Sequence, residues 1–162
     1  MKFFLTKKIP GILLAGNLNK MKKKLYIGCS LSLLPAEEKE NFLQMIDDIK
    51  KKLSNDFEIL EFLGIKDLGG PKEFTPREIY DYDIKKCVMQ TDCMLAICDF
   101  PSIGLGYEMA TCIEKRGIPV LAVARQGRIV GRIIRGIDHQ NFQFYYYDSV
   151  DDLISKTFEA LK

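Results

Sequence analysis

The chain has 162 residues, of which 47% are hydrophobic and 28% are charged, so it suits one globular domain with a sizeable core. A net charge of +2 is too small to indicate a nucleic-acid partner, and the lysine clusters are typical of solvated faces. The five cysteines form no C-x-x-C pair and only one histidine is present, which argues against a zinc site and favours reduced thiols in the cytoplasm.

The first 20 residues combine basic residues with a short apolar patch at 9–16. The patch contains Pro10, lacks a small-residue cleavage site and is too short to span a membrane. A second methionine, Met21, opens a strand-like segment. We therefore expect residues 1–20 to be a poorly ordered extension, not a signal peptide, and residues 21–162 to form a single domain.

Apolar residues recur along the chain with strand and helix periods in alternation. Thr75 and Pro76 form the start signal of one helix, and Gly117 closes another. In chain order we expect a strand at 24–30, a helix at 36–53, a strand at 57–64, a Gly- and Pro-rich loop at 65–76, a helix at 77–91, a strand at 92–100, a helix at 106–117, a strand at 118–124, a short helix or turn at 127–137, a strand at 142–147 and a helix at 149–162.

Strands that are apolar throughout and alternate with helices are typical of a parallel sheet covered on both faces. The sequence therefore predicts the α/β class, a three-layer sandwich with a five-stranded parallel sheet of flavodoxin-like or Rossmann-like type. In such sheets, ligands lie beyond the carboxyl ends of the strands, near the switch in strand order. The loops that carry function are then expected at 28–36, 65–76, 99–108 and 125–131.

The segment PSIGLGYE at 101–108 follows the strongest predicted strand and permits three interpretations. A dinucleotide fingerprint needs G-x-G-x-x-G after the first strand, and this segment lacks the third glycine. A structural interpretation lets Gly104 and Gly106 adopt positive φ and places Glu108 in the first turn of a helix, where the dipole stabilises a carboxylate by about 0.3–1 kcal/mol.

The third interpretation is catalytic. A carboxylate in a first helical turn lies among unpaired backbone N–H groups, which favour its ionised form. An ionised carboxylate is what attack on the anomeric carbon of a sugar requires. Asp81 and Asp83, on the preceding predicted helix, are candidates for the partner acid, although both also fit a solvated helix face.

Four motifs resemble the nucleoside 2-deoxyribosyltransferase superfamily from about Lys24 to the C-terminus: YIGCS at 26–30, YDI at 82–84, DFPSIGLGYE at 99–108 and IIRGI at 133–137. The resemblance implies cleavage of an N-glycosidic bond, with Glu108 as the nucleophile that forms a covalent glycosyl-enzyme intermediate. It implies that Asp83 protonates the leaving base or orients the sugar and that Tyr26 hydrogen-bonds to the nucleophile. The substrate-binding candidates that follow from these motifs and their neighbours are Gly28, Ser30, Ser32, Asp99, Ser102, Gly104, Gly106, Arg132 and Arg135.

Within this family, the residue at the Ser102 position separates the members. Transferases that act on free deoxynucleosides carry Asp there, whereas the 2′-deoxynucleoside 5′-monophosphate N-hydrolases carry Ser, which donates a hydrogen bond to phosphate. Ser102 therefore favours a phosphorylated substrate, although a plain turn after Pro101 explains it equally well.

Three features of this chain depart from the hydrolases. Ser32 occupies the place of a phosphate-binding Arg, and Gly131 replaces a Ser expected from a neighbouring subunit. Arg132 or Arg135 is a candidate to supply the missing charge, because Arg suits bidentate phosphate binding. The spacing from Asp83 to Asp92 is one residue longer than in these relatives, which keeps Asp81 as an alternative acid.

The resulting prediction is a cytoplasmic N-glycosidase that releases the base from a 2′-deoxynucleoside 5′-monophosphate without metal or organic cofactor. A nucleoside 2-deoxyribosyltransferase and a non-catalytic nucleotide-binding module remain as alternatives. We expect a homo-oligomer, a dimer or larger, since family members usually assemble so that one subunit completes the site of another.

Overall fold

The computed structural model describes residues 21–31, 33–63 and 74–162. The described residues form a five-stranded sheet in the order β2-β1-β3-β4-β5, and every neighbouring pair of strands is parallel. The predicted α/β class with a five-stranded parallel sheet is therefore confirmed. In chain order the elements are β1 (Lys23–Cys29), α1 (Ala36–Leu53), β2 (Phe57–Glu61), α3 (Pro76–Tyr80), the π-helical segment η1 (Asp81–Val88), β3 (Cys93–Ile97), α4 (Ile103–Ala110), the π-helical segment η2 (Thr111–Arg116), β4 (Val120–Arg125), α5 (Arg132–Arg135), β5 (Phe142–Tyr147) and α6 (Val150–Leu161).

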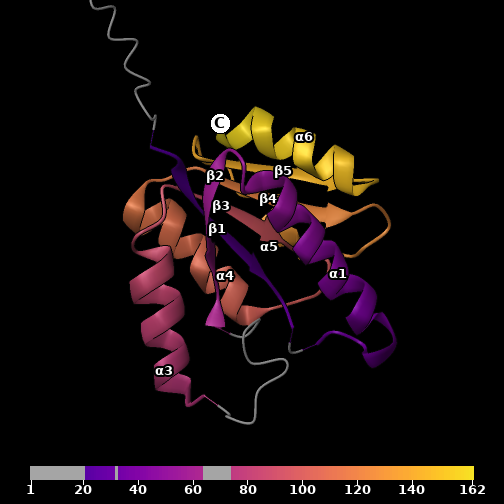
Figure 1. Ribbon diagram of the computed structural model, residues 1–162, viewed down its shortest axis with the longest axis horizontal. Coiled ribbons are helices and arrows are strands. Elements are labelled where there is room, and N and C mark those ends of the chain that lie inside the picture. The colour runs from indigo at the N-terminus through magenta and orange to yellow at the C-terminus, as the bar shows by residue number, and fades with distance from the viewer. Residues whose placement is uncertain (1–20, 32, 64–73) are drawn as a thin grey trace, which may run out of the picture.

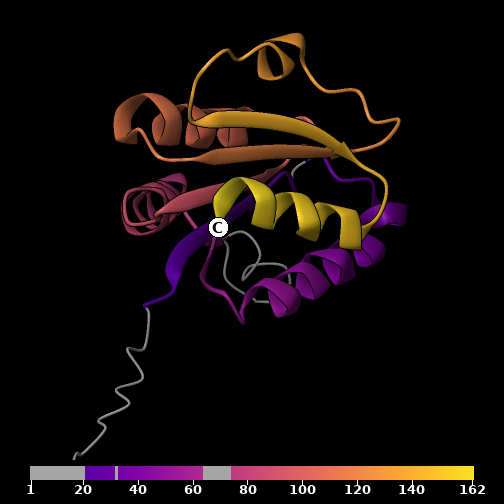
Figure 2. The same cartoon turned by 90° about the horizontal axis from the view of Figure 1, so that it is seen from above.

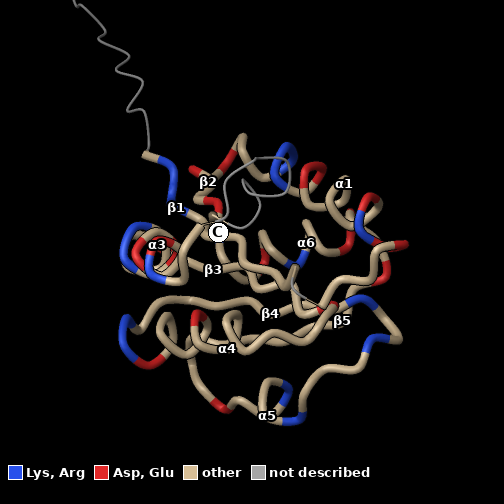
Figure 3. Tube along the Cα trace, turned by 90° about the horizontal axis from the view of Figure 1, so that it is seen from below, with Lys and Arg blue, Asp and Glu red and all other residues tan. Residues whose placement is uncertain are grey.

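Helices cover both faces of the sheet and make three layers. Helices α1 and α6 lie on one face, whereas α3 and α4 lie on the other, with α5 beside α4 (Figures 1 and 2). The central strand β3 is buried along its whole length, which explains why its sequence is apolar at every position instead of alternating. The positions of charged residues along the Cα trace lie mainly on the helices and loops around the sheet (Figure 3).

The strand order reverses between β1 and β3. The chain passes from β1 outward to β2, then returns to β3 on the other side of β1 and continues to β5. This is the flavodoxin-like order, in which the crevice at the carboxyl ends of the two central strands receives ligands. Segments that follow β1 and β3, together with the start of α4, therefore border the expected binding site.

The helix expected at 106–117 begins three residues earlier, at Ile103. Ser102 is its N-cap, because the Ser102 hydroxyl accepts a hydrogen bond of 3.1 Å from the backbone N–H of Leu105. Gly104 and Gly106 consequently lie inside the helix, and the positive φ expected for them is wrong. Among the described residues, positive φ occurs only at Gly117 and Gly127.

Candidate active site

Glu108 lies in the second turn of α4, not in the first turn as the sequence predicted. Its side chain is half-buried and is directed toward β1. A Cβ atom at position 28 would lie only 2.9 Å from Glu108 Oε2 and 2.9 Å from Leu105 Cδ1, so Gly28 is needed for this close approach of α4 to the strand. The absence of a side chain at Gly28 thus leaves room for the Glu108 carboxyl group.

The predicted preference of Glu108 for its ionised form is also wrong. Burial and the charge of Asp83 together raise the pKa of Glu108 to about 8, although contact with Tyr26 opposes the rise. The N-cap donor that the sequence argument relied on is already occupied by Ser102, and the carboxylate lies too deep in the helix to reach the free N–H groups. The surroundings of Glu108 therefore favour its protonated form.

Asp83 lies on the neighbouring helical segment, in η1, with an exposed fraction of 6%. Burial raises the pKa of Asp83, and a hydrogen bond of 2.6 Å from the backbone N–H of Leu63 opposes the rise. Asp81, the alternative acid, is partly exposed and pairs with Lys85 and Arg77, which lower its pKa. Of the two, only Asp83 lies close enough to Glu108 for their charges to interact strongly.

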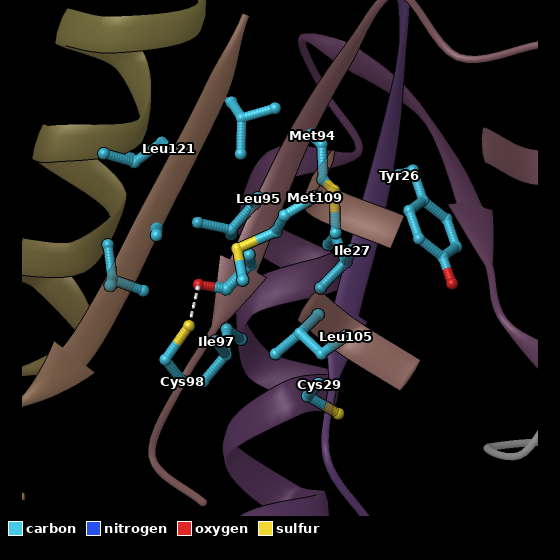
Figure 4. Close-up of a cluster of buried hydrophobic side chains, with 14 of the residues drawn as sticks. Tyr26, Ile27, Cys29, Met94, Leu95, Ile97, Cys98, Leu105, Met109 and Leu121 are labelled. Atoms are coloured by element: carbon cyan, nitrogen blue, oxygen red, sulfur yellow. Dashed lines mark hydrogen bonds between the residues drawn. The ribbon is translucent and has the colours of Figure 1, made fainter. Parts of the chain in front are cut away.

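Tyr26 lies on β1 and is fully buried. Figure 4 shows the ring at the edge of the apolar cluster, with the hydroxyl directed away from the labelled Met and Leu side chains. Within the described residues this hydroxyl makes no hydrogen bond of good geometry. Burial raises the pKa of Tyr26, and the charges of Glu108 and Asp83 raise it further. A buried hydroxyl that lacks a partner costs about 1–3 kcal/mol, so its retention beside two carboxyl groups calls for an explanation.

Two predicted serines lie where β1 and β3 end. Ser30 is buried and its hydroxyl donates a hydrogen bond of 2.9 Å to the carbonyl of Pro101, which ties the loop after β1 to the start of α4. Ser102 uses its oxygen as the helix cap, and the hydroxyl proton is still available to a ligand. Gly104 and Gly106 leave the surface of α4 open, because added Cβ atoms would meet little or nothing.

Other predicted site residues are not part of this cluster. Asp99 is buried on the α1 side of the sheet, where it accepts hydrogen bonds of 2.5 Å from the Tyr147 hydroxyl and 2.7 Å from the Arg125 N–H. Arg132 and Arg135 are exposed on α5, and Arg135 donates to the carbonyl of Val130. Ser32, the extension at 1–20 and most of the loop expected at 65–76 lie outside the described residues.

A cavity of about 270 Å³ separates α4 from α5. Its walls are mostly apolar, with Ser102 at one side and Gly131 at the other. Leu105 lines this cavity and also contacts the space at Gly28, so its side chain stands between the cavity and Glu108. The Leu105 side chain is therefore shared by the lining of the cavity and the surroundings of Glu108.

Sequence reasoning did not single out Leu63, whose backbone N–H holds Asp83, or Tyr80, which lies close to Tyr107. Tyr80 precedes the candidate acid Asp83 by three residues, and this short separation is the sequence signal that could have pointed to it. In the part of the chain that the structure describes, no cluster of three or more His, Cys, Asp or Glu is arranged to hold a metal ion. No helix of the described ranges has the length and apolar character needed to cross a membrane.

Sequence comparison finds relatives with curated names. A protein of Thermofilum pendens named putative 2′-deoxynucleoside 5′-phosphate N-hydrolase 1 is 39% identical over 87 residues, which are 52% of this chain and 59% of that protein. The 5-hydroxymethyl-dUMP N-hydrolase of Rattus norvegicus is 32% identical over 106 residues, which are 62% of this chain and 61% of the relative. The chain thus matches only about three fifths of the length of these proteins. No protein-family model matches the sequence.

Structural comparison finds a similar fold in the CMP N-glycosidase BcmB of Clostridium botulinum. The two structures superpose with a TM-score of 0.63 at 16% sequence identity, over 85% of this chain and 99% of the other. At this identity the likeness supports the fold alone. It agrees with the five-stranded parallel sheet described above.

Proposed function

Since curated relatives are named as 2′-deoxynucleoside 5′-phosphate and 5-hydroxymethyl-dUMP N-hydrolases, we propose that this chain hydrolyses the N-glycosidic bond of 2′-deoxynucleoside 5′-monophosphates. The observation that carries the proposal is the group formed by Glu108, Asp83 and Tyr26 at the strand-order switch. Two carboxyl groups with interacting charges and a buried hydroxyl without a partner lie together there. Such a group of titratable residues at the ligand crevice is typical of a catalytic site.

In the proposed reaction, the Glu108 carboxylate attacks C1′ of the sugar. The bond from C1′ to the base breaks, and Asp83 gives its proton to the leaving base, so that a glycosyl ester on Glu108 remains. Water then attacks the same carbon, Asp83 takes up one proton of that water, and sugar phosphate is released with Glu108 restored. This is the retaining two-carboxylate scheme.

The elevated pKa of Glu108 constrains how this reaction starts. At neutral pH, the interacting pair holds one proton between its two members, and the free protein favours its location on Glu108. The reactive form has that proton on Asp83. We infer that bound substrate favours this transfer, because positive charge developing at C1′ stabilises an ionised Glu108, and a hydrogen bond from Tyr26 adds to the effect.

The phosphate is assigned to the region where the loop after β1 meets the N-terminus of α4. Ser102 has a hydroxyl proton to donate there, and Ser30 holds the two segments together. The α4 N-terminus adds a favourable dipole for an anion. Arg132 is the candidate for the opposing charge, since Gly131 and Ser102 line one cavity and Arg132 follows Gly131 directly.

We further propose that the protein is a homo-oligomer. Three large apolar side chains near this cavity are almost fully exposed: Ile103 (96%), Ile129 (92%) and Ile133 (85%). Exposed apolar groups that gather beside a cavity are typical of an interface. The cytoplasmic location expected from the sequence stays a prediction, and the described cysteines, all five of them free and buried, fit a reducing compartment.

The test is an assay of the wild-type protein with 2′-deoxynucleoside 5′-monophosphates and with the matching nucleosides, each with and without a second free base. Free base and 2-deoxyribose 5-phosphate from the monophosphates alone are the expected products. Transfer of the sugar to the second base would instead identify a transferase, and tight binding without any product would identify a non-catalytic module. Intact mass spectrometry after rapid acid quenching should detect a glycosylated protein, and the absence of this adduct under turnover would argue against the covalent step.

A further inference from the structure

Two tyrosine rings connect the helices that carry the carboxyl groups. Tyr80 ends α3 and Tyr107 lies on α4, and their ring centroids are 6.4 Å apart with a tilt of 44°. The Tyr80 hydroxyl contacts Tyr107 closely enough to raise the pKa of Tyr107. Both rings remain accessible, with exposed fractions of 43% for Tyr80 and 52% for Tyr107.

Helix geometry places this pair next to the carboxyl groups. Tyr80 is the last residue of α3 and precedes Asp83, in η1, by three residues. Tyr107 directly precedes Glu108, and its ring faces Tyr80 across the space between the helices. The ring contact and the charge interaction between Asp83 and Glu108 therefore connect the same two helical segments at neighbouring positions.

Open space lies beside the pair. Gly104 precedes Glu108 by four residues, on the same flank of α4, and a Cβ there would meet nothing closer than the Ser102 hydroxyl at 3.7 Å. The face of α4 at Gly104 is therefore backbone that a planar group is able to approach closely. Accessible aromatic surface beside buried polar groups is typical of a ligand site.

We propose that Tyr80 and Tyr107 form the wall against which the leaving base of the nucleotide stacks. The assignment rests on the proposed function, because Asp83 as proton donor fixes where the base must lie. A nucleobase is a planar ring, and stacking on an aromatic side chain contributes about 1–3 kcal/mol per base. The phosphate, in contrast, is assigned to Ser102 at the start of α4, one to two turns away from Tyr107.

The two tyrosines have different parts in this wall. Tyr80 offers its ring, one side of which is near the Lys85 amine at 6.0 Å from the ring centroid. Tyr107 orients Tyr80 through the contact between the rings and hydroxyls. Tyr80 is thus a base-binding residue, and Tyr107 is a positioning residue. Every base has a ring that stacks, so this wall tolerates different bases.

The test is isothermal titration calorimetry in the Glu108→Gln background, which prevents turnover. The probes are dCMP and dGMP, which carry a base, and 2-deoxyribose 5-phosphate, which does not. Tyr80→Ala should weaken binding of dCMP and dGMP by about 5- to 150-fold, the equivalent of 1–3 kcal/mol. Binding of 2-deoxyribose 5-phosphate should stay within about twofold, which a general disruption of the site would not allow.

Two further variants complete the experiment. Tyr80→Phe keeps the ring and should retain nucleotide affinity, whereas Tyr146→Ala removes an equally accessible ring on β5 and should change nothing. Equal weakening of all three probes by Tyr80→Ala, or unchanged nucleotide affinity, overturns the base wall alone. If the Glu108→Gln protein binds none of the nucleotides, the proposed function fails together with the wall. A melting curve for each variant verifies that it is folded.

Discussion

Two carboxyl groups lie close after β3, near the strand-order switch, and they differ in how many hydrogen bonds the protein donates to them. Asp99 lies just after β3 and faces α1, whereas Glu108 lies on α4, on the opposite face of the sheet. Asp99 accepts hydrogen bonds with both oxygens, from the Tyr147 hydroxyl and the Arg125 N–H. No described residue gives Glu108 a hydrogen bond of comparable geometry, and the Tyr26 hydroxyl nearby is without a partner.

The surroundings of the two carboxylates extend this difference. Next to Asp99, the Arg128 guanidinium pairs with Glu38 and lies 4.6 Å from the centroid of the Phe100 ring. Around Glu108 the nearest charged group is another carboxyl, Asp83, which disfavours ionisation. A carboxylate with paired oxygens is suited to holding segments together, and one with unpaired oxygens keeps its capacity for a ligand.

The largest expected effect separates the two carboxylates by activity. Glu108→Gln should lower base release by at least about 10³-fold, because it removes the nucleophile while preserving shape. Asp99→Asn should retain most of the activity per folded molecule. The measurement is kcat for release of free base from a 2′-deoxynucleoside 5′-monophosphate. Comparable losses in the two variants would contradict the division of roles.

The next effect separates them by stability. Asp99→Asn should lower the free energy of unfolding by about 1–3 kcal/mol, because an amide cannot accept from both buried donors as the carboxylate does. Tyr147→Phe removes one of these donors and should destabilise by a smaller amount. Urea unfolding at neutral pH measures both changes. If the Asp99→Asn variant is as stable as the wild type, the hydrogen bonds of Asp99 do not contribute to the stability of the fold.

A third variant tests whether Gly28 provides the space for Glu108. Gly28→Ala places a methyl group against Glu108 Oε2 and should reduce kcat/KM by about 10- to 100-fold, since a displacement near 1 Å has effects of this size. The comparison is with the wild-type protein, and a melting curve verifies that the Gly28→Ala variant is folded. Equal activity of the two proteins would show that the close approach at Gly28 is not needed.

The smallest effect is a pH dependence that follows from the carboxyl pair. Because the pKa of Glu108 is about 8, the pair loses its last proton above that pH, and kcat/KM should fall by about tenfold per pH unit. The unfolded chain loses this proton near pH 4.5, so the native state binds more protons between these values and its stability should decline as the pH rises through this window. Glu108→Gln should abolish the part of that decline that comes from Glu108, as thermal melts across the same pH range would measure. A flat activity profile up to about pH 10 would contradict the shared proton.

The fold was predictable because its signals are local. Continuous apolar runs identified the strands, and Thr75 was correctly identified as a helix cap, where its hydroxyl accepts from the Glu78 N–H. The positions of Asp83 and Glu108 on neighbouring helices followed from the order of the elements. Roles for these residues still depend on the proposed function.

The details of the site depend on long-range packing and were not predictable in the same way. The helix-start argument assumed that α4 begins at Gly106, but the Ser102 cap moves the start forward and Glu108 inward. Burial against β1 then reverses the expected charge preference of Glu108. Asp99 belongs to the same sequence motif as Ser102 and Glu108. Only its hydrogen bonds with Tyr147 and Arg125 reveal that its side chain lies on the opposite face of the sheet from Glu108.

The wide turns of η1 bear on how this protein tolerates changes in chain length. A π-helical turn takes up one residue more than an α-helical turn, so an inserted residue is absorbed as a local widening of the helix. Within η1, Asp83 is buried and accepts a hydrogen bond from the backbone N–H of Leu63. A change of one residue in the length of this segment is therefore expected to leave the orientation of the Asp83 side chain in place.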